Sequence, residues 1–295
     1  MEAGDIPYRR LDEGILQRIR HAVGDKALIL DDGVRENLGK DATADGCPPE
    51  AVVEAACVEQ VEALLRLANE FRFPVTPRGT GTGLSGGCIP VLGGVTLSLE
   101  RMNRIVSIDP GNLVAVVEPG VINGDLKKAA REVGLFYPPD PASFDTCSLG
   151  GNAATNAGGA SCVKYGTTRD YVLGLEAVLP TGIRITTGVQ TRKGVVGYDL
   201  TRLLVGSEGT LGVITRLVLK LIPLPPAVMT LVVFFPDLSS AMQSVMKILY
   251  SGYTPCALEF LDRHCLDLVG DLLPFEGVRD AVSYTHLTLP TIYSV

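Results

Sequence analysis

The stretch TPRGTGTGLSGG at residues 76–87 constrains this chain more than any other feature, because five of its twelve residues are glycine. Glycine loses more conformational freedom on folding than any other residue, so this density indicates a backbone path that side chains would obstruct. The stretch holds one cation, Arg78, and no carboxylate. A tight turn between two strands is the simpler interpretation, but a turn needs only one or two glycines. We therefore favour a loop whose backbone approaches a flat or anionic ligand.

Two familiar phosphate-binding patterns do not fit this loop. The spacing Gly81-x-Gly83-x-x-Gly86 matches the dinucleotide fingerprint of nicotinamide enzymes. That fingerprint requires a helix directly after it, because the helix N-terminus holds the pyrophosphate. Here GCIPVLGGVTLSL follows, with a proline, further glycines and a strand-like run. A P-loop fails as well, since no Lys-Ser or Lys-Thr ends the run. A nest of successive backbone N–H groups remains, and such a nest holds phosphate without a helix.

Length, charge and hydropathy limit the class of protein. At 295 residues, with 46% hydrophobic residues, the chain is long enough for about two domains with buried cores. A net charge of −7 without a run of Lys and Arg argues against a nucleic-acid partner. The N-terminus lacks a signal pattern, and the apolar runs are too short to span a bilayer. We expect a cytoplasmic protein without a transmembrane segment, and peripheral docking on the inner membrane through a partner stays open.

The cysteines do not form a recognisable metal or disulfide pattern. No two have the two-residue spacing typical of zinc ribbons and iron–sulfur ligands. Their odd number and the missing signal argue against a disulfide framework. We expect reduced, mostly buried thiols at Cys47, Cys57, Cys88, Cys147, Cys162, Cys256 and Cys265.

Hydrophobic periodicity predicts the order of helices and strands. Apolar residues at i, i+3 and i+4 spacing predict helices at 12–23, 58–72 and 122–133. Short β-favouring runs predict strands at 51–55, 74–78, 95–99, 104–109 and 113–120, then a hairpin over 172–188 and a long apolar strand within 202–225. Residues 136–166 show neither period, and a loop of this length in a compact domain is usually functional. From 228 onward, strand, helix, strand and helix are expected at 228–235, 237–250, 256–261 and 262–273, the opening of an α+β unit.

The last stretch, SYTHLTLPTIYSV at 283–295, fits nothing before it. It resembles the translated sequencing-adapter tail that ends many draft metagenomic reading frames, so we expect native sequence to stop near Val282. His286 and Tyr293 are therefore left out of any site. The alternative is a genuine C-terminal strand.

Four ordered motifs carry a resemblance to a known family. Residues 78–82 with 84–87 resemble the pyrophosphate loop of the vanillyl-alcohol oxidase/p-cresol methylhydroxylase (PCMH-type) flavoprotein superfamily. PPDPASFDTCSLGGNAATNAGG at 138–159, the following Tyr165-Gly166 and GSEGTLGVIT at 206–215 resemble later FAD segments of its glycolate oxidase FAD subunit and D-lactate dehydrogenase group. The resemblance covers about residues 41–282, and four motifs in order make it specific.

The resemblance implies an α+β fold with a defined domain order. A PCMH-type FAD-binding domain of two α/β subdomains would occupy 41–225, followed at 226–282 by the start of a ferredoxin-like α+β substrate (cap) domain. Residues 1–40 would form an N-terminal helical segment and 283–295 the non-native tail. In this group the C-terminal domain runs about 200 residues further. We therefore expect a C-terminally truncated chain that supplies the FAD-binding half.

The resemblance also implies how the segments hold FAD. N–H groups of the first loop, with two threonine hydroxyls, would meet the pyrophosphate oxygens. Glycines of the second segment would allow close approach, and the third segment would lie beside the adenine and ribose. The implied FAD-binding residues are Pro77, Arg78, Gly79, Thr80, Gly81, Thr82, Gly83, Asp140, Ser148, Gly150, Gly151, Asn152, Thr155, Asn156, Ala157, Gly158, Glu208, Gly209, Thr210, Leu211, Gly212, Val213 and Ile214. The alternatives are a flexible linker for the second segment and an ordinary helix-to-strand turn for the third.

The implied reaction is oxidation of a small 2-hydroxy acid by hydride transfer to flavin N5. Covalent members attach flavin through a histidine in the first loop, where Thr82 stands here, so the resemblance implies non-covalent FAD. The substrate-binding residues and a histidine-containing metal site of the group lie in the C-terminal domain beyond this chain, so we assign no catalytic residue and no metal here. Asp262, His264 and Asp267 are expected to form a solvated charged face rather than a metal cluster.

Three functional hypotheses stay open. The first is the FAD-binding half of a glycolate, D-lactate or D-2-hydroxyglutarate dehydrogenase. Its electron acceptor stays open between oxygen, a quinone, a cytochrome and an iron–sulfur partner, so an iron–sulfur or quinone-linked electron-transfer subunit is one candidate partner. The second is another flavoenzyme of the superfamily, such as an alkyl-glycerone-phosphate synthase or an aryl-alcohol oxidase; NAATNAGG at 152–159 favours the first. The third is a non-catalytic FAD-binding module, against which the half-built unit after 228 argues.

Overall fold

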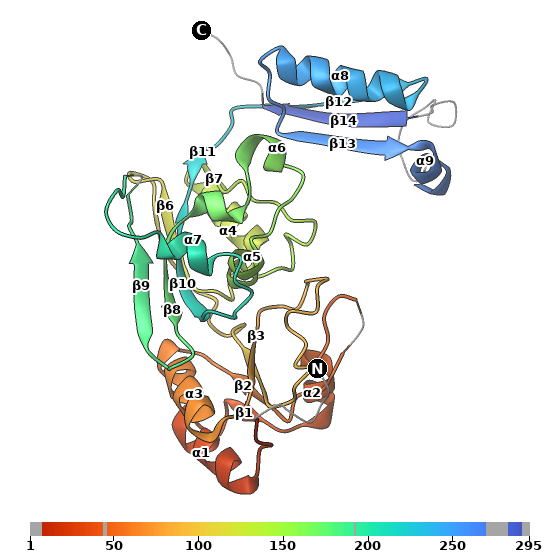
Figure 1. Cartoon of the computed structure of the whole chain (residues 1–295). Coiled ribbons are helices and arrows are strands. Elements are labelled where there is room, and N and C mark those ends of the chain that lie inside the picture. Colours follow the sequence, from red (N-terminus) through yellow and green to blue (C-terminus); the bar gives the residue numbers. More distant parts are fainter. Residues whose placement is uncertain (1–7, 44–45, 192, 270–282, 291–295) are drawn as a thin grey trace. The chain divides into compact units, whose positions relative to one another are not determined.

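The computed structural model describes residues 8–43, 46–191, 193–269 and 283–290, which form two compact units (Figure 1). The first unit comprises the chain up to Tyr137 together with Ser143–Ala157 and Thr168–Ile222. The second unit comprises Pro138–Ala142, Gly158–Thr167 and the chain from Pro223 onward. The long segment without periodicity at 136–166 is thus divided between the units.

The first unit begins with a four-stranded sheet in the order β1-β2-β4-β3. Its strands are β1 (Leu28–Ile29), β2 (Ala51–Glu54), β3 (Val75–Arg78) and β4 (Val95–Ser98). Strands β2 and β3 run parallel to β4, because helix α3 (Val58–Phe71) returns the chain to the same end of the sheet, and β1 is antiparallel to β2.

Helices α1 (Glu13–Val23) and α3 lie side by side on this sheet (Figure 1). Helix α1 begins where Asp12 accepts the N–H of Ile15 at 2.9 Å. Its buried stripe, including Ile19, shares one hydrophobic cluster with Leu64 of α3 and Leu97 of β4. A further short helix, α2 (Asp32–Leu38), has no buried residue.

The second sheet of the first unit is antiparallel, in the order β5-β6-β10-β8-β9. Its strands are β5 (Ile105–Asp109), β6 (Val114–Val117), β8 (Val172–Val178), β9 (Arg184–Gly188) and β10 (Val213–Lys220). The accompanying elements are α4 (Asn123–Glu132), β7 (Leu135–Phe136), α5 (Leu149–Thr155), a 3-10 turn (Thr168–Tyr171), α7 (Leu200–Leu204) and β11 (Ile222–Pro223). Leu175 of β8 and Leu217 of β10 are fully buried.

The second unit is a small α+β structure. Its antiparallel sheet has the order β12-β14-β13, formed by β12 (Val228–Phe235), β13 (Ala257–Asp262) and β14 (Ser283–Pro290). Helix α8 (Leu238–Tyr250) covers one face of this sheet (Figure 1). The short helices are α6 (Cys162–Tyr165) and α9 (Arg263–Val269). Among the helices that the structure describes, none is long and apolar enough to cross a membrane.

Most of the predicted elements are confirmed, and the differences have physical reasons. Every predicted strand, the hairpin and the helices at 12–23, 58–72 and 122–133 are present within a few residues. Helix α9 is described only to Val269, so the end predicted for it at 273 lies outside the described residues. The prediction for the thiols was wrong in one respect: all seven are free, but only Cys147 is buried.

The segment 283–290 differs from our expectation in one way. We excluded it from the fold, whereas the structure makes it β14, the central strand of the second unit's sheet. The alternating sequence of this stretch suits a strand. Its origin as a non-native tail stays a prediction.

Candidate functional site

The glycine loop begins where β3 ends at Arg78 and is braced from within the protein. The Arg78 side chain is only 7% exposed, and its guanidinium donates to the carbonyl of Lys40 and lies 3.2 Å from the sulfur of Cys88. Gly81 has φ +72, and a Cβ there would overlap this guanidinium, so the position requires glycine twice over. The buried Arg78 guanidinium therefore supports the loop from its protein-facing side.

Asp41 holds the other end of the same loop. Its Oδ2 accepts the N–H of Gly86 at 2.9 Å, and its Oδ1 accepts the hydroxyl and the N–H of Thr43. The hydrogen bonds from Thr43 keep the pKa of the Asp41 carboxyl below its ordinary value, so it is ionised at neutral pH. Sequence analysis missed Asp41; the only signal is that an Asp-x-Thr turn precedes the loop in sequence.

The outer side of the loop stays open. Thr80 and Thr82 are half-buried and Gly83 is exposed, with open space where a Cβ would lie. Two hydroxyl donors and successive backbone N–H groups therefore border accessible space, as a phosphate nest requires.

The second segment meets the loop at the start of α5. Ser148 caps this helix, its Oγ accepting the N–H of Gly151 at 3.3 Å. A Cβ at Gly79 would overlap that Oγ, and a Cβ at Gly150 would overlap Pro119. These two glycines are therefore required by close packing rather than by turn geometry.

The third segment joins both others. The N–H of Gly206 donates to Ala153 at 2.9 Å, and the N–H of Glu208 donates to Ala154 at 2.8 Å, so the turn is bonded to α5. A Cβ at Gly209 would lie 3.1 Å from the Pro77 ring. Glu208 has φ +52, a left-handed conformation that a residue with a side chain adopts at a cost. Three segments that are far apart in the sequence thus converge in one place.

Asn156 and Arg169 tie the second and third segments together. Asn156 ends α5 in the left-handed conformation, at φ +50, and its Oδ1 accepts the N–H of Arg169 at 2.9 Å. The Arg169 guanidinium donates to the carbonyl of Val205 at 3.0 Å. The Oδ1 atom of Asn156 is thereby bonded within the protein itself. Arg169 is a second residue that sequence analysis missed, and no local pattern marks it.

Asn152 offers a different kind of group. It is 4% exposed, and its Nδ2 finds no acceptor among the described residues. A buried amide donor without an acceptor costs free energy, so a ligand oxygen or nitrogen at this point would be stabilising. Thr155, by contrast, bonds its hydroxyl back to the carbonyl of Gly151 at 3.0 Å.

The end of the third segment enters β10. Val213 and Ile214 are 3% and 6% exposed, and both pair with β8. On the other side, the ladder to β6 begins only at Leu217, so within the described strands one edge of β10 at 213–216 has no strand partner. Of the other residues in this turn, Thr210 and Leu211 are exposed and Gly212 is buried.

Two predicted FAD-binding residues lie in the second unit. Asp140 accepts the hydroxyl of Ser161 at 2.6 Å and its N–H at 3.1 Å, and Gly158 lies beside Cys162. Their neighbour Ala157 belongs to the first unit, where its carbonyl accepts the hydroxyl of Thr168 at 2.7 Å. The structure therefore brings together the first loop, α5 and the 206–214 turn in the first unit, whereas Asp140 and Gly158 belong to the second unit.

Comparison with known proteins decides the family. The family model "FAD binding domain" matches residues 49–188, and that of the "FAD linked oxidases, C-terminal domain" matches residues 224–290. The chain belongs to the FAD-linked oxidases. It has a PCMH-type FAD-binding domain followed by part of the C-terminal oxidase domain. The glycine loop and α5 lie within the residues matched to the FAD-binding domain, and the 206–214 turn lies between the two matched ranges.

Curated relatives and solved structures agree with this family. Glycolate oxidase subunit GlcD of Bacillus subtilis is 46% identical over 223 residues, covering 76% of this chain and 47% of the relative. D-lactate dehydrogenase of Anaerostipes hadrus is 40% identical over 275 residues, covering 92% and 57%. The chain thus spans about half the length of these relatives. An alkyldihydroxyacetonephosphate synthase (TM-score 0.81, 23% identity, 96% of this chain and 56% of that one) and p-cresol methylhydroxylase (0.79, 21%, 97% and 62%) share the fold.

Proposed function

We propose that this FAD-linked oxidase chain is the FAD-binding half of an enzyme that oxidises a small 2-hydroxy acid, namely glycolate, D-lactate or D-2-hydroxyglutarate. The convergence of the glycine loop, α5 and the 206–214 turn is the observation that carries the FAD-binding part. The names of the relatives, a glycolate oxidase subunit and a D-lactate dehydrogenase, support the substrate class.

The residues of the first unit fit the cofactor that the FAD-binding domain implies. Backbone N–H groups at 79–83 and the hydroxyls of Thr80 and Thr82 would hold the pyrophosphate. The unsatisfied amide of Asn152, and backbone groups of β10 at 213–216 where no described strand pairs with that edge, would form hydrogen bonds with the rest of FAD. When bound, FAD supplies the N5 atom that accepts hydride from the α-carbon of the substrate.

The proposal includes non-covalent FAD, because Thr82 stands where covalent members of the superfamily carry a histidine. The groups that hold the substrate carboxylate, and any metal, would belong to the C-terminal domain of the longer relatives. Electrons would pass to a separate iron–sulfur or quinone-linked subunit, consistent with the word "subunit" in the name of one relative.

A visible spectrum with an FAD titration tests this proposal. We expect the purified chain to bind FAD, to show flavin absorption after gel filtration, and to release all flavin on acid denaturation. We expect no reduction of the bound flavin by D-lactate, glycolate or D-2-hydroxyglutarate. A chain that does not bind FAD would contradict the proposal, flavin retained after denaturation would contradict the non-covalent state, and turnover would contradict the assignment of the substrate groups to the C-terminal domain.

A further inference from the structure

The two sheets of the first unit meet where the β8–β9 hairpin packs on α3. Gly182, in the turn of this hairpin, has φ +76, and a Cβ there would overlap the Arg66 side chain and lie 3.0 Å from the carbonyl of Glu62. Val178 and Val213 of the second sheet lie in the same hydrophobic cluster as the first sheet. The contact is therefore tight in both its polar and its apolar part.

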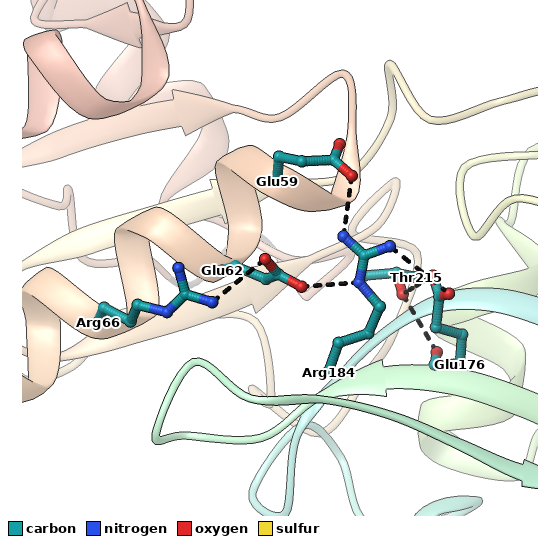
Figure 2. Close-up of polar contacts among 6 residues, drawn as sticks. All are labelled: Glu59, Glu62, Arg66, Glu176, Arg184 and Thr215. Carbon is teal, nitrogen blue, oxygen red and sulfur yellow. Dashed lines mark hydrogen bonds and ion pairs between the residues drawn. The ribbon is translucent and has the colours of Figure 1, made fainter.

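Arg184 forms ion pairs across this contact (Figure 2). Its Nε lies 2.7 Å from Glu62 and its Nη2 lies 2.8 Å from Glu59, both on α3. Its Nη1 lies 4.0 Å from Glu176 on β8. The side chains of Glu62 and Glu176 are 15% and 14% exposed, so these pairs are screened less than an ordinary surface pair.

The same network continues to the third FAD segment. Glu176 Oε1 accepts the hydroxyl of Thr215 at 2.9 Å, and Thr215 is 1% exposed. Thr215 directly follows Ile214, at the register shift between Ile214 and Arg216 in β10. A chain of polar contacts thus runs from α3 through Arg184 and Glu176 to β10, the strand that the third FAD segment enters.

We infer that Arg184 is a positioning residue for FAD, a role that rests on the proposed function. The glycine loop follows β3 of the first sheet, whereas α5 and the 206–214 turn accompany the second sheet. A ligand gripped by both requires their separation to be fixed to within a fraction of an ångström. Arg184 fixes it by holding β9 and β8 against α3, although it lies outside the FAD segments themselves.

FAD titration of three variants tests this role. Arg184→Gln removes the guanidinium that links β9 to α3. We expect about tenfold weaker FAD binding at a temperature well below the unfolding transition. Arg184→Lys keeps the charge with a single donor group and should restore part of the affinity. Arg66→Gln is the matched control, because Arg66 pairs with the same Glu62 at 3.3 Å but within α3, and glutamine keeps the Cγ atom that lies against Gly182. It should bind FAD as the wild type does.

The outcomes separate the two proposals. If the wild type binds FAD and Arg184→Gln binds it equally well, the positioning role is wrong even where the variant melts earlier, since a purely structural role lowers the melting temperature alone. If the wild type does not bind FAD, the proposed function fails and the positioning role fails with it. Should Arg184→Gln not fold, Glu59→Gln removes the more exposed carboxylate, and about twofold to threefold weaker binding is expected. Wild-type affinity in that variant would overturn the inference.

Discussion

At the scale of single residues, several glycines of the site are set by neighbouring atoms. Gly79 faces the Oγ of Ser148, Gly150 faces Pro119 and Gly81 faces the guanidinium of Arg78. Added methyl groups at such contacts force backbone or side-chain shifts. Gly83, four residues after Gly79, has open space instead. Two glycines of one loop therefore differ in what they do.

The first prediction follows from this difference. We expect Gly79→Ala to lower the free energy of unfolding by about 1–3 kcal/mol, because its methyl group displaces Ser148 and loosens the cap of α5. Gly83→Ala should leave the free energy of unfolding within about 0.5 kcal/mol of the wild type. Chemical denaturation of the apoprotein measures both.

A double variant checks the cause of the Gly79→Ala effect. Ser148→Ala alone should cost about 1 kcal/mol through loss of the cap. Combined with Gly79→Ala, it should cost less than the sum of the two single changes, since it removes the Oγ atom that clashes. Strict additivity would mean that the two residues do not meet as described.

At the scale of elements, the site depends on helix α5, which the sequence pattern does not predict. Helix α5 reads LGGNAAT, with two glycines, an asparagine and no amphipathic stripe. It is held by the Ser148 cap, the Asn156 end and tight packing of Gly150 on Pro119. Ser148 and Asn156 flank the helix directly, and only Pro119 is distant in sequence. Because α5 has no apolar stripe, periodicity could not find the helix.

The limits of sequence analysis are the same elsewhere. Long elements with an apolar stripe, such as α1 and α3, were predicted within one residue of their bounds. Helix α2 was missed because none of its residues is buried, so no stripe exists. For the site, glycine density located the three converging segments. Asp41 and Arg169 brace those segments through contacts to Gly86 and Asn156, which are distant in sequence, so no local pattern predicts those contacts.

The second prediction concerns the end of α5. Asn156 adopts a left-handed conformation, which glycine accepts freely and alanine does not. Asn156→Ala and Asn156→Gly both lose the hydrogen bond from Arg169, so their difference isolates the backbone term. We expect the alanine variant to be about 1 kcal/mol less stable than the glycine variant by chemical denaturation. Equal stability would remove the capping role.

At the scale of the whole molecule, the three converging segments belong to one unit, whereas Asp140 and Gly158 belong to the other. The glycine loop, α5 and the 206–214 turn lie in the first unit, which has its own hydrophobic core. The second unit begins the C-terminal oxidase domain, and the relatives are about twice as long as this chain. The two units can therefore be perturbed one at a time, which makes the role of β14 testable.

The third prediction uses a chain that ends at Val282. Strands β12 and β13 each pair with β14 and not with each other in the described sheet, so removing 283–295 leaves both without a ladder partner. Unpaired strands expose their backbone groups and lose the surface on which α8 packs.

We expect trypsin to cleave at Lys247 in α8 several-fold faster in the shortened chain. Cleavage at Lys128 should match the full-length chain, because α4 belongs to the first unit. FAD affinity should also match, because the three converging segments belong to that unit. Unchanged cleavage at Lys247 would show that β14 does not hold this sheet together, whereas faster cleavage at both sites would show that the units do not fold independently.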